Sequence, residues 1–299
     1  MMRRLYVYKD LLRIRYSTYP MVASLTGTLI GIHDMGDYDF NKILLSTIVI
    51  LLLWWGGMVT NQILDVQIDR KAISIAKDGA YDIGAIKENF PIARGAISIK
   101  ESMILTIIIY LLSFFIAYYL NIWCFVVAIT ICFFTQIYNK YFKFMSLWGS
   151  LFFASLISSS YLMGSLGANH VTKLHLLIIL STIFYHTGVH IFGCIKDYDS
   201  DKQLNINTFA VNIGIKRASL VGVFFLSAGY LIAIIPAYLK WLSPYYVLLV
   251  IISLLISLPS AIKTVVFPSS FMGWKTLSTN IVASTILYGS YILGLIKFK

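Results

Sequence analysis

Long apolar runs separated by short polar segments make up most of this chain. A helix that crosses a bilayer needs about twenty mostly apolar residues, and nine runs approach or reach that length. Each run is bounded by charged residues, Gly, Pro or Asn, which are typical of helix ends and loops. The pattern predicts an all-α integral membrane protein with about nine transmembrane helices. The expected spans are residues 17–33, 42–62, 98–120, 122–139, 147–167, 174–195, 217–237, 244–265 and 275–296.

The composition favours the same class of protein. Of the 299 residues, 59% are hydrophobic and 12% are charged, and the mean hydropathy is +0.80. A chain of this composition has lipid as its main solvent. The N-terminal 16 residues are basic, and no small-residue cleavage site follows them, so we expect no cleavable signal peptide.

Basic residues are distributed unevenly between the two sides of the predicted bundle. With nine spans and a cytoplasmic N-terminus, almost all Lys and Arg residues fall in cytoplasmic segments, as the positive-inside rule requires. We therefore expect the N-terminus to be cytoplasmic. The net charge of +11 is explained by this bias and by attraction to anionic lipid, so no nucleic acid partner is expected. The exceptions are Lys42, Lys173, Lys240, Lys297 and Lys299.

A cluster of polar residues closes the second apolar run. The stretch Asn61–Asp69 reads NQILDVQID, and its amide and two carboxylates, Asn61, Asp65 and Asp69, are spaced by four. On a helix this spacing places the three side chains on one face. Oxygen ligands of this kind suit a hard cation such as Mg²⁺, which commonly shares its ligands with a substrate phosphate. For one such stretch alone, a solvated helix end is the alternative.

A second acidic cluster closes the sixth run. The stretch Lys196–Asp201 reads KDYDSD, in which Asp197 and Asp201 repeat the spacing of four and Asp199 lies between them. Two such clusters, each at the end of a hydrophobic helix on the cytoplasmic side, can face one another. This repetition favours metal binding over a merely solvated helix end.

The order of features along the chain also repeats. A pair of spans, an acidic cluster and a second pair of spans occupy residues 17–141, and the same order recurs over 147–265, with a ninth span at 275–296. We expect a single membrane-embedded domain over 1–299, built from two four-helix repeats plus one helix. Repeats of this kind usually place the site between the two halves.

Histidine and cysteine residues within the spans indicate function less clearly than the two acidic clusters do. His186 and His190 lie four apart on the sixth span, and a polar residue inside a span is a functional candidate. Lining a cavity and making helix contacts both remain open for them. The three cysteines, Cys124, Cys132 and Cys194, lie in apolar runs without a CxxC spacing, so we expect buried thiols.

Four stretches together resemble the UbiA-type intramembrane prenyltransferase superfamily over nearly the whole chain. They are NQILDVQID, NFPIARGAIS, YNKYFKFMSLWGS and KDYDSDKQLNINTFAVNIG. The resemblance implies nine helices in two four-helix repeats plus one, and two Asp-rich motifs that bind a prenyl diphosphate through two Mg²⁺ ions. The implied metal ligands are Asn61, Asp65, Asp69, Asp197 and Asp201. YNKYFK is similar to the family's tyrosine and basic pair, which implies that Tyr138 and Lys143 contact the diphosphate.

Other basic residues are expected to assist. Arg13 or Arg15, at the start of the first span, would add fixed positive charge where the diphosphate charge develops, and Lys196 and Asp199 of the second cluster are further candidate substrate contacts. The chain departs from the family's RPIPSG-like turn at Phe90, where an Arg is usual. The alternatives for the missing contact are Arg94, Lys71, Lys77 and Lys87, and Asp78 and Asp82 in the same insertion are expected to form a solvated loop face.

These features predict a Mg²⁺-dependent enzyme that transfers a polyprenyl group from an allylic diphosphate to a lipophilic acceptor and releases diphosphate. Asp65, Asp69, Asp197, Asp201 and Lys143 would carry the reaction. DYDSD resembles the quinone-pathway branch better than the KDIED-type pattern, so an aromatic acceptor is expected. The alternative is a glycerol-phosphate ether lipid.

Two other classes of protein are less consistent with these residues. A repeat-built transporter is disfavoured because the acidic residues lie at helix ends on one wet side rather than near the midplane. A binding scaffold without turnover would tolerate loss of a motif carboxylate, whereas all of the expected ones are present.

Overall fold

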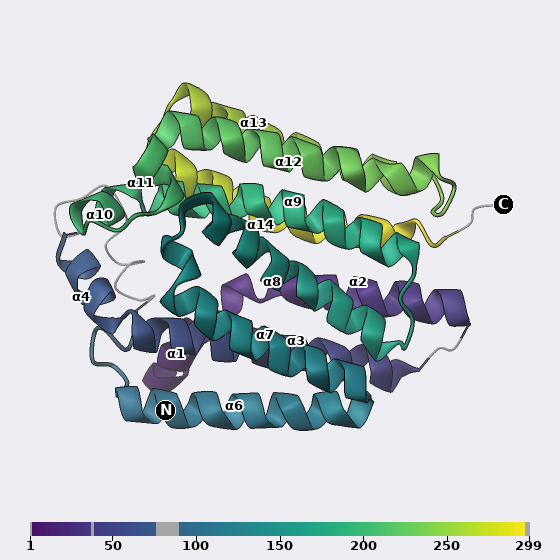
Figure 1. The fold of residues 1–299 in the computed structure, drawn as a ribbon, viewed down its shortest axis with the longest axis horizontal. Helices are drawn as coiled ribbons and strands as arrows, with labels where there is room; N and C mark the ends of the chain where they lie inside the picture. The colour runs from purple at the N-terminus through teal and green to yellow at the C-terminus, as the bar shows by residue number, and fades with distance from the viewer. Residues whose placement is uncertain (1, 37–38, 76–89, 297–299) are drawn as a thin grey trace.

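The structure is a computed structural model that describes residues 2–36, 39–75 and 90–296, with the side chains of residues 2, 3, 15 and 75 left out. Within these residues the chain forms a bundle of helices and no strands (Figure 1). The elements are α1 (Met2–Leu11), η1 (Ile14–Tyr16), α2 (Thr18–Met35), α3 (Phe40–Leu64), α4 (Val66–Ile75), α6 (Ile99–Leu120), α7 (Ile122–Lys140), η3 (Phe142–Phe144), α8 (Ser146–Gly167), α9 (Lys173–Lys196), α10 (Tyr198–Gln203), α11 (Phe209–Ile213), α12 (Ile215–Tyr238), α13 (Tyr246–Val266) and α14 (Ser270–Leu293).

Each expected span coincides with a helix in the described residues. Seven helices there, namely α3, α6, α7, α8, α9, α12 and α13, are long and apolar enough to cross a membrane, which identifies an integral, polytopic membrane protein. The expected number of nine is not confirmed, because α2 and α14 fall outside this set. Polar residues lower the hydropathy of both helices. In α2 these are the exposed His33 and Asp34 together with buried Ser and Thr residues, and in α14 they are Asn280 and several Ser and Thr residues.

Side-chain caps set the beginnings of several helices. The Asp39 carboxylate accepts a hydrogen bond from the Asn41 N–H at 2.8 Å before α3, and the Ser98 hydroxyl accepts one from the Glu101 N–H at 3.1 Å before α6. Asn121 caps α7 in the same way, with its side-chain oxygen 2.8 Å from the Cys124 nitrogen. Such caps satisfy backbone donors that have no partner within the helix.

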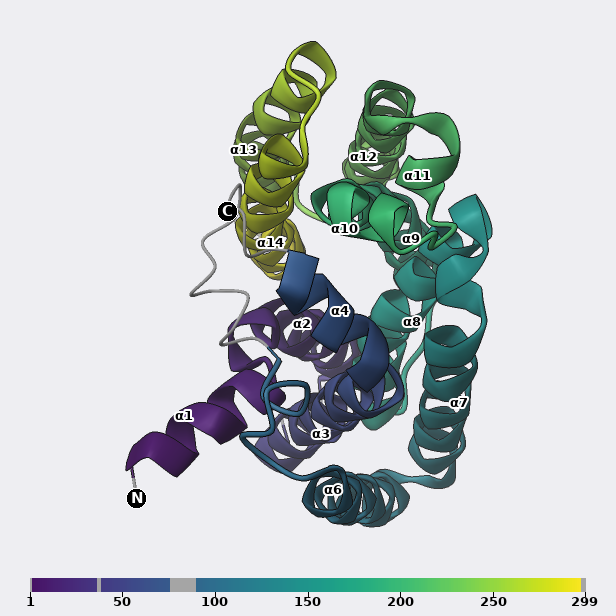
Figure 2. The ribbon, with the colours of Figure 1, turned by 90° about the vertical axis from the view of Figure 1, so that its left-hand side faces the viewer.

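Six long helices, namely α2, α3, α7, α8, α9 and α14, surround a central cavity, and three others pack against them without lining it. The outer helices are α6, which packs on α3, α12, which packs on α9, and α13, which packs on α14. Figure 2 shows this arrangement along the helix axes. The outer helices expose many large apolar side chains, as expected where lipid covers them.

Small residues bring α2 and α8 into close contact. A Cβ added at Gly27 would meet the Tyr161 carbonyl oxygen of α8, and one added at Gly164 would meet the Ser24 carbonyl oxygen of α2. Reciprocal glycines of this kind allow two helix backbones to approach closely within a membrane. This contact joins the first and second halves of the chain.

Buried polar side chains join α9, α13 and α14. The Asn280 side-chain oxygen accepts hydrogen bonds from the Tyr185 hydroxyl at 3.0 Å and from the Ser257 hydroxyl at 2.6 Å. Asn280 is fully buried, so both lone pairs need such partners. The network fixes α14 against the second half of the bundle.

The helix ends that carry the two acidic clusters lie at the same end of the bundle. Figure 1 shows α4, which follows the first cluster, and α10 and α11, which follow the second, grouped at one end. The fold thereby brings together two segments that are more than a hundred residues apart in sequence.

Candidate active site

The two acidic clusters occupy matching helix ends. Asp65 is the C-cap of α3, with φ −93° and ψ 4°, and Asp197 is the C-cap of α9, with φ −92° and ψ 4°. A short helix follows each of them and contains the second carboxylate. The backbone N–H of Asp69 donates to the Asp65 carbonyl at 2.8 Å, and that of Asp201 donates to the Asp197 carbonyl at 2.9 Å.

This geometry corrects one sequence-based expectation. Asn61, Asp65 and Asp69 do not lie on one continuous helix, because the ψ angle of Asp65 ends α3 and the chain restarts as α4. Aspartate competes with the helical backbone for hydrogen bonds and is common at helix ends. Asn61 and Asp65 still share a face, since the Asn61 Nδ2 donates to Asp65 Oδ2 at 2.8 Å.

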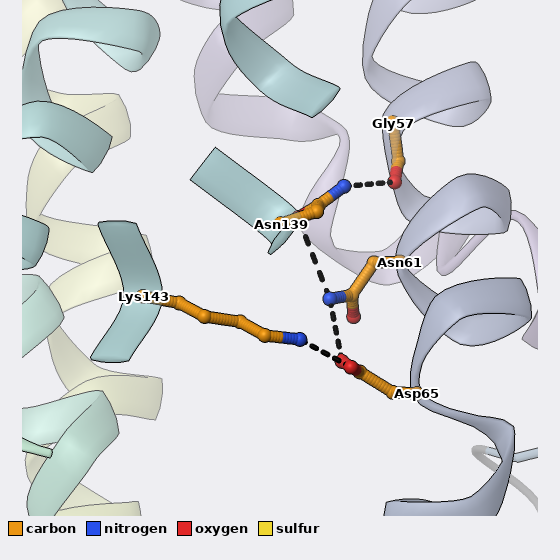
Figure 3. Close-up of polar contacts among 5 residues, drawn as sticks. All are labelled: Gly57, Asn61, Asp65, Asn139 and Lys143. Carbon is orange, nitrogen blue, oxygen red and sulfur yellow. Dashed lines mark hydrogen bonds and ion pairs between the residues drawn. The ribbon is translucent and has the colours of Figure 1, made fainter. Parts of the chain in front are cut away.

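Lys143 pairs with Asp65 across the site (Figure 3). Lys143 belongs to η3, and its Nζ donates to Asp65 Oδ1, with both side chains largely shielded from solvent. On the same side, the Asn61 Nδ2 lies 3.4 Å from Asn139 Oδ1, and the Asn139 Nδ2 lies 3.5 Å from the Gly57 carbonyl oxygen. The first cluster is thus held by groups from both α3 and the α7–η3 segment.

Tight packing sets the position of η3. A Cβ added at Gly149, in the first turn of α8, would meet the Phe142 carbonyl oxygen of η3. Ser146 begins α8 with a φ of +49°, a left-handed conformation that reverses the chain direction within a few residues at some energetic cost. These two features place Lys143 beside the end of α3.

Arg13 reaches the site from the turn before α2. Its backbone is left-handed, with φ 48° and ψ 48°, and its guanidinium lies over the Phe90 ring, with Cζ 5.7 Å from the ring centroid. The Arg13 Nε is buried and has no hydrogen-bond partner among the described residues. Strained backbone and an unsatisfied buried donor are both more common at functional sites. Arg13 therefore supplies positive charge beside Phe90, where the sequence departs from the family pattern.

The second cluster has a different set of partners. The Lys196 Nζ lies 3.0 Å from Asp197 Oδ1, and Asp199 accepts a hydrogen bond from the Ser270 hydroxyl of α14. Lys196 and Asp197 line the central cavity, whereas Asp199 is exposed and is not part of the lining. The contact with Ser270 indicates that Asp199 anchors α14 to this end of the bundle.

The cavity has a volume of about 330 Å³. On α3 its lining runs from Ile50 to Asn61, which at 1.5 Å per residue corresponds to a depth of about 16 Å. Charged and amide groups line the end near the acidic clusters, and apolar groups such as Leu53, Ile131 and Ile281 line the deeper part. The cavity therefore suits an elongated apolar molecule with an anionic head group.

Tyr138, His186 and His190 line this cavity too. The Tyr138 hydroxyl lies 2.7 Å from His190 Nε2, and His186 Nε2 lies 3.1 Å from the hydroxyl of Tyr288 in α14. The sequence left open whether the two histidines line a cavity or make helix contacts, and each does both.

Two carboxylates outside the spans have unusual acidity. Burial raises the pKa of Asp69 to about 7; nearby Asp65 raises it further, while Arg13 opposes the shift. Burial also raises the pKa of Asp201 to about 7, again with a contribution from a neighbouring carboxylate, that of Asp197. In both cases burial is the largest cause of the raised pKa, and neighbouring charges add less.

The donor set fits a hard divalent cation. Asn61, Asp65, Asp69, Asp197 and Asp201 offer only oxygen ligands, which Mg²⁺ prefers, and the raised pKa values of Asp69 and Asp201 indicate a place where added positive charge is favourable. In the described part of the chain, no three carboxylate, histidine or cysteine side chains already converge as a metal site. Asp65 is instead paired with Lys143, so binding of a cation requires this pair to open.

Several expected contacts lie elsewhere. Arg94 and Lys71 are exposed and do not line the cavity. The side chain of Arg15 and the residues Lys77, Lys87, Asp78 and Asp82 lie outside the described residues. For these last four the structure gives no placement, and the expectations remain predictions.

Some lining residues were not singled out by the sequence. Asn139 lies next to Tyr138 in YNKYFK and could have been found through that motif, because it is an amide near the end of an apolar run. Tyr19 and Phe153 also line the cavity, but an aromatic residue in a membrane helix carries no such signal, since most of them face lipid or the core.

Comparison with known proteins defines the class. A family model described as the UbiA prenyltransferase family matches residues 21–282, so this chain belongs to the UbiA prenyltransferase family. The expected prenyltransferase class of enzyme is thereby confirmed, and the transporter and scaffold alternatives are set aside.

Individual relatives cover nearly the whole chain. A digeranylgeranylglyceryl phosphate synthase of Saccharolobus solfataricus is 26% identical over 294 residues, covering 97% of this chain and 95% of the relative. The structure of a UbiA homolog from Aeropyrum pernix K1 matches with a TM-score of 0.74 at 17% identity, covering 95% of this chain and 99% of that one. That of a UbiA homolog from Archaeoglobus fulgidus bound to DMAPP and Mg²⁺ has a TM-score of 0.64 at 17% identity, with coverages of 92% and 98%. These structural matches establish the shared fold.

Proposed function

We propose that this enzyme transfers a prenyl group from an allylic prenyl diphosphate to a glycerol-phosphate lipid in a Mg²⁺-dependent reaction. The observation that carries the proposal is one cavity with Asp197 and the basic Arg13, Lys143 and Lys196 at its mouth and apolar groups in its depth. The similarity to a digeranylgeranylglyceryl phosphate synthase over nearly the whole chain favours this acceptor. The aromatic, quinone-type acceptor expected from DYDSD is supported less well.

The charges at the mouth of the cavity are consistent with two anionic substrates. Arg13, Lys143 and Lys196 all line it. A diphosphate donor and an acceptor with its own phosphate would bring more negative charge into this space than an acceptor with a single carboxylate. Fixed cations that are partly withdrawn from water stabilise such anions strongly.

Substrate binding would rearrange the first cluster. Lys143 forms an ion pair with Asp65 in the structure. When the diphosphate enters, Lys143 moves to its oxygens and releases the Asp65 carboxylate. Bound Mg²⁺, held by Asn61, Asp65, Asp69, Asp197 and Asp201, would act as a Lewis acid that neutralises the leaving diphosphate. The number of ions proposed is two.

The remaining groups act on the organic part of the substrates. When the carbon–oxygen bond to diphosphate breaks, an allylic cation forms, and an aromatic face nearby stabilises it by about 0.5–2 kcal/mol. Tyr138 and Phe153 offer such faces next to the polar end. The acceptor hydroxyl oxygen then bonds to this carbon and loses its proton, which gives an ether and free diphosphate.

The experiment compares acceptors directly. Purified protein in nanodiscs is given radiolabelled geranylgeranyl diphosphate and Mg²⁺, with a glycerol phosphate bearing one prenyl ether chain, a hydroxybenzoate or a dihydroxynaphthoate. We expect labelled product and diphosphate release with the glycerol-phosphate lipid only, and none with a chelator present. Product with an aromatic acceptor alone would restore the quinone-type alternative.

We further propose nine spans, arranged as two four-helix repeats plus one, with the N-terminus and both acidic clusters in the cytoplasm. The matching backbone geometry at Asp65 and Asp197 and the distribution of Lys and Arg support this arrangement. An odd number of spans places the C-terminus on the opposite side from the N-terminus. A periplasm-dependent reporter such as alkaline phosphatase, fused after residue 299 and expressed in a bacterium, should therefore be active, and an inactive fusion would contradict the topology.

A further inference from the structure

A chain of three hydrogen-bonding side chains borders the cavity just inside its polar end. The Tyr138 hydroxyl of α7 lies 2.7 Å from His190 Nε2 of α9, and His190 Nδ1 lies 3.0 Å from the Ser150 hydroxyl of α8. Both ring nitrogens of His190 are therefore occupied by partners from two other helices. Such a histidine has a fixed ring orientation.

The aromatic surroundings restrict the same two rings. The Phe153 ring lies 4.5 Å from the His190 ring and 5.4 Å from the Tyr138 ring, measured between centroids. The Phe152 ring stacks on Tyr138 at 6.4 Å with an interplanar angle of 6°. Tyr138 is buried, so its hydroxyl needs a partner, and His190 is the one the structure provides.

Tyr138 lies deeper in the cavity than expected for a residue that only contacts the diphosphate. It lies five residues before Lys143, and its hydroxyl is directed to His190, which is seven residues, or about 10 Å of helix, from Asp197. Tyr138 thus lies deeper than the charged groups that would hold the diphosphate, at the level where the reacting carbon of a bound prenyl chain would follow its head group.

We propose that His190 is a positioning residue, which acts by holding the Tyr138 phenol against the reacting carbon, with Ser150 fixing the other side of its ring. The inference rests on the proposed prenyl transfer. Because the aromatic face stabilises only the cation that forms during the reaction, misplacement of Tyr138 lowers turnover more than substrate binding.

The principal variants separate the hydrogen bond from the ring. His190→Phe keeps a ring of similar size but cannot bond to Tyr138. We expect kcat to fall about 5- to 30-fold, within the contribution of an aromatic face to a nearby cation, with the KM for the prenyl diphosphate changed less than about threefold. His190→Gln keeps a polar atom near the place of Nε2 and should recover kcat to within about twofold of the wild type. Equal losses for both variants would overturn the proposal.

A double-mutant cycle tests whether His190 acts through the Tyr138 hydroxyl. In a Tyr138→Phe background, the added His190→Phe change should lower kcat by less than about twofold, because the hydroxyl through which His190 holds the ring is already absent. Full multiplication of the two single effects would show that His190 acts independently of Tyr138. Tyr230→Phe is the matched control, since Tyr230 is also buried and bonds to Ser253 at 2.7 Å, away from the cavity.

A second readout does not depend on turnover. The chain has five histidines, so ¹⁵N labelling of histidine gives a spectrum simple enough to assign by substitution. Tyr138→Phe should shift the His190 Nε2 resonance, whereas Tyr230→Phe should leave it in place. An unchanged His190 signal in Tyr138→Phe protein would refute the contact itself. Failure of the wild-type protein to form any product would instead count against the proposed function, which this spectrum does not address.

Discussion

At the scale of single residues, the clearest prediction concerns Asp65 and Asp197, the two aspartates at the ends of α3 and α9. Asp65→Asn and Asp197→Asn should each lower turnover by at least about 100-fold, because each removes a charged ligand for the metal and diphosphate. The melting temperature should change little for Asp197→Asn, whose side chain is half exposed. It should fall modestly for Asp65→Asn, which leaves the shielded Lys143 without its partner. Radiolabelled product formation and thermal unfolding in detergent measure the two effects.

Asp34→Asn is the matched control for these variants. Asp34 lies near the end of α2 that is far from the acidic clusters, and it pairs with His33 and His170 at 3.6 Å. It is therefore an aspartate with polar partners that lies outside the candidate active site. Turnover should stay near the wild-type rate. A loss as large as that of Asp65→Asn would mean that the Asp65 effect does not report on the site.

Lys143 gives a prediction with opposite signs for two measurements. Lys143→Met removes the cation that pairs with Asp65 and would compete with Mg²⁺ for it, so Mg²⁺ alone should bind more tightly, by about 1 kcal/mol or about fivefold. Turnover should nevertheless fall, because a fixed positive charge near the diphosphate is lost. Calorimetric titration with Mg²⁺ and a product assay test the two parts.

Lys275→Met serves as the comparison for Lys143. The Lys275 Nζ lies over the Phe271 ring at 4.5 Å, on α14 and outside the central cavity. Neither Mg²⁺ binding nor turnover should change. If Lys143→Met weakened binding of Mg²⁺ alone, Lys143 would not be the competing partner of Asp65 that the structure indicates.

At the scale of elements, the contact between η3 and α8 positions Lys143. Gly149→Val would force a side chain against the Phe142 carbonyl oxygen, and the segment that must shift is η3. We expect a moderate loss of stability, about 1–3 kcal/mol as for other overpacked sites, and a larger loss of turnover because Lys143 moves. Unfolding curves and product assays on the same preparation compare the two.

Gly289→Ala is the control for this element. Gly289 lies on α14, and a Cβ there would meet nothing within 4 Å. Alanine also favours the helix over glycine by about 1 kcal/mol, so the melting temperature should stay equal or rise and turnover should not change. A fall in turnover with Gly289→Ala would indicate that substitutions in helices act generally rather than through η3.

At the scale of the whole molecule, the charge balance of the site links stability to pH. Asp69 and Asp201 have pKa values of about 7 in the fold, above the ordinary value of about 3.9. Between these values the unfolded chain has released protons that the folded chain still holds, so stability of the metal-free protein falls as pH rises through this window. Most of the loss is complete above about pH 7.

Mg²⁺ should offset this loss, because a cation favours the ionised carboxylates. The rise in melting temperature on adding Mg²⁺ should therefore be larger at pH 8 than at pH 5.5. Thermal unfolding in detergent with Mg²⁺ or with a chelator, at both pH values, measures it. A larger Mg²⁺ effect at pH 5.5 would contradict the assignment of these two carboxylates to the metal site.

The sequence by itself determined the helical membrane class, the approximate helix bounds and the position of both acidic clusters. Long apolar runs leave few alternatives, since a chain in lipid must satisfy its backbone hydrogen bonds within each segment. The distinctive motifs around Asn61, Tyr138 and Asp197 also sufficed to predict the family. These features can be predicted from local sequence because the spacing of residues along one helix determines which side chains share a face of that helix.

Only the tertiary structure decided which groups meet. The break at Asp65, the pairing of Lys143 with Asp65, the placement of Arg13 over Phe90 and the bond between Tyr138 and His190 each depend on how separate helices pack. Contacts between distant segments depend on how all the helices pack together, so they cannot be predicted from the residue pattern of any single helix.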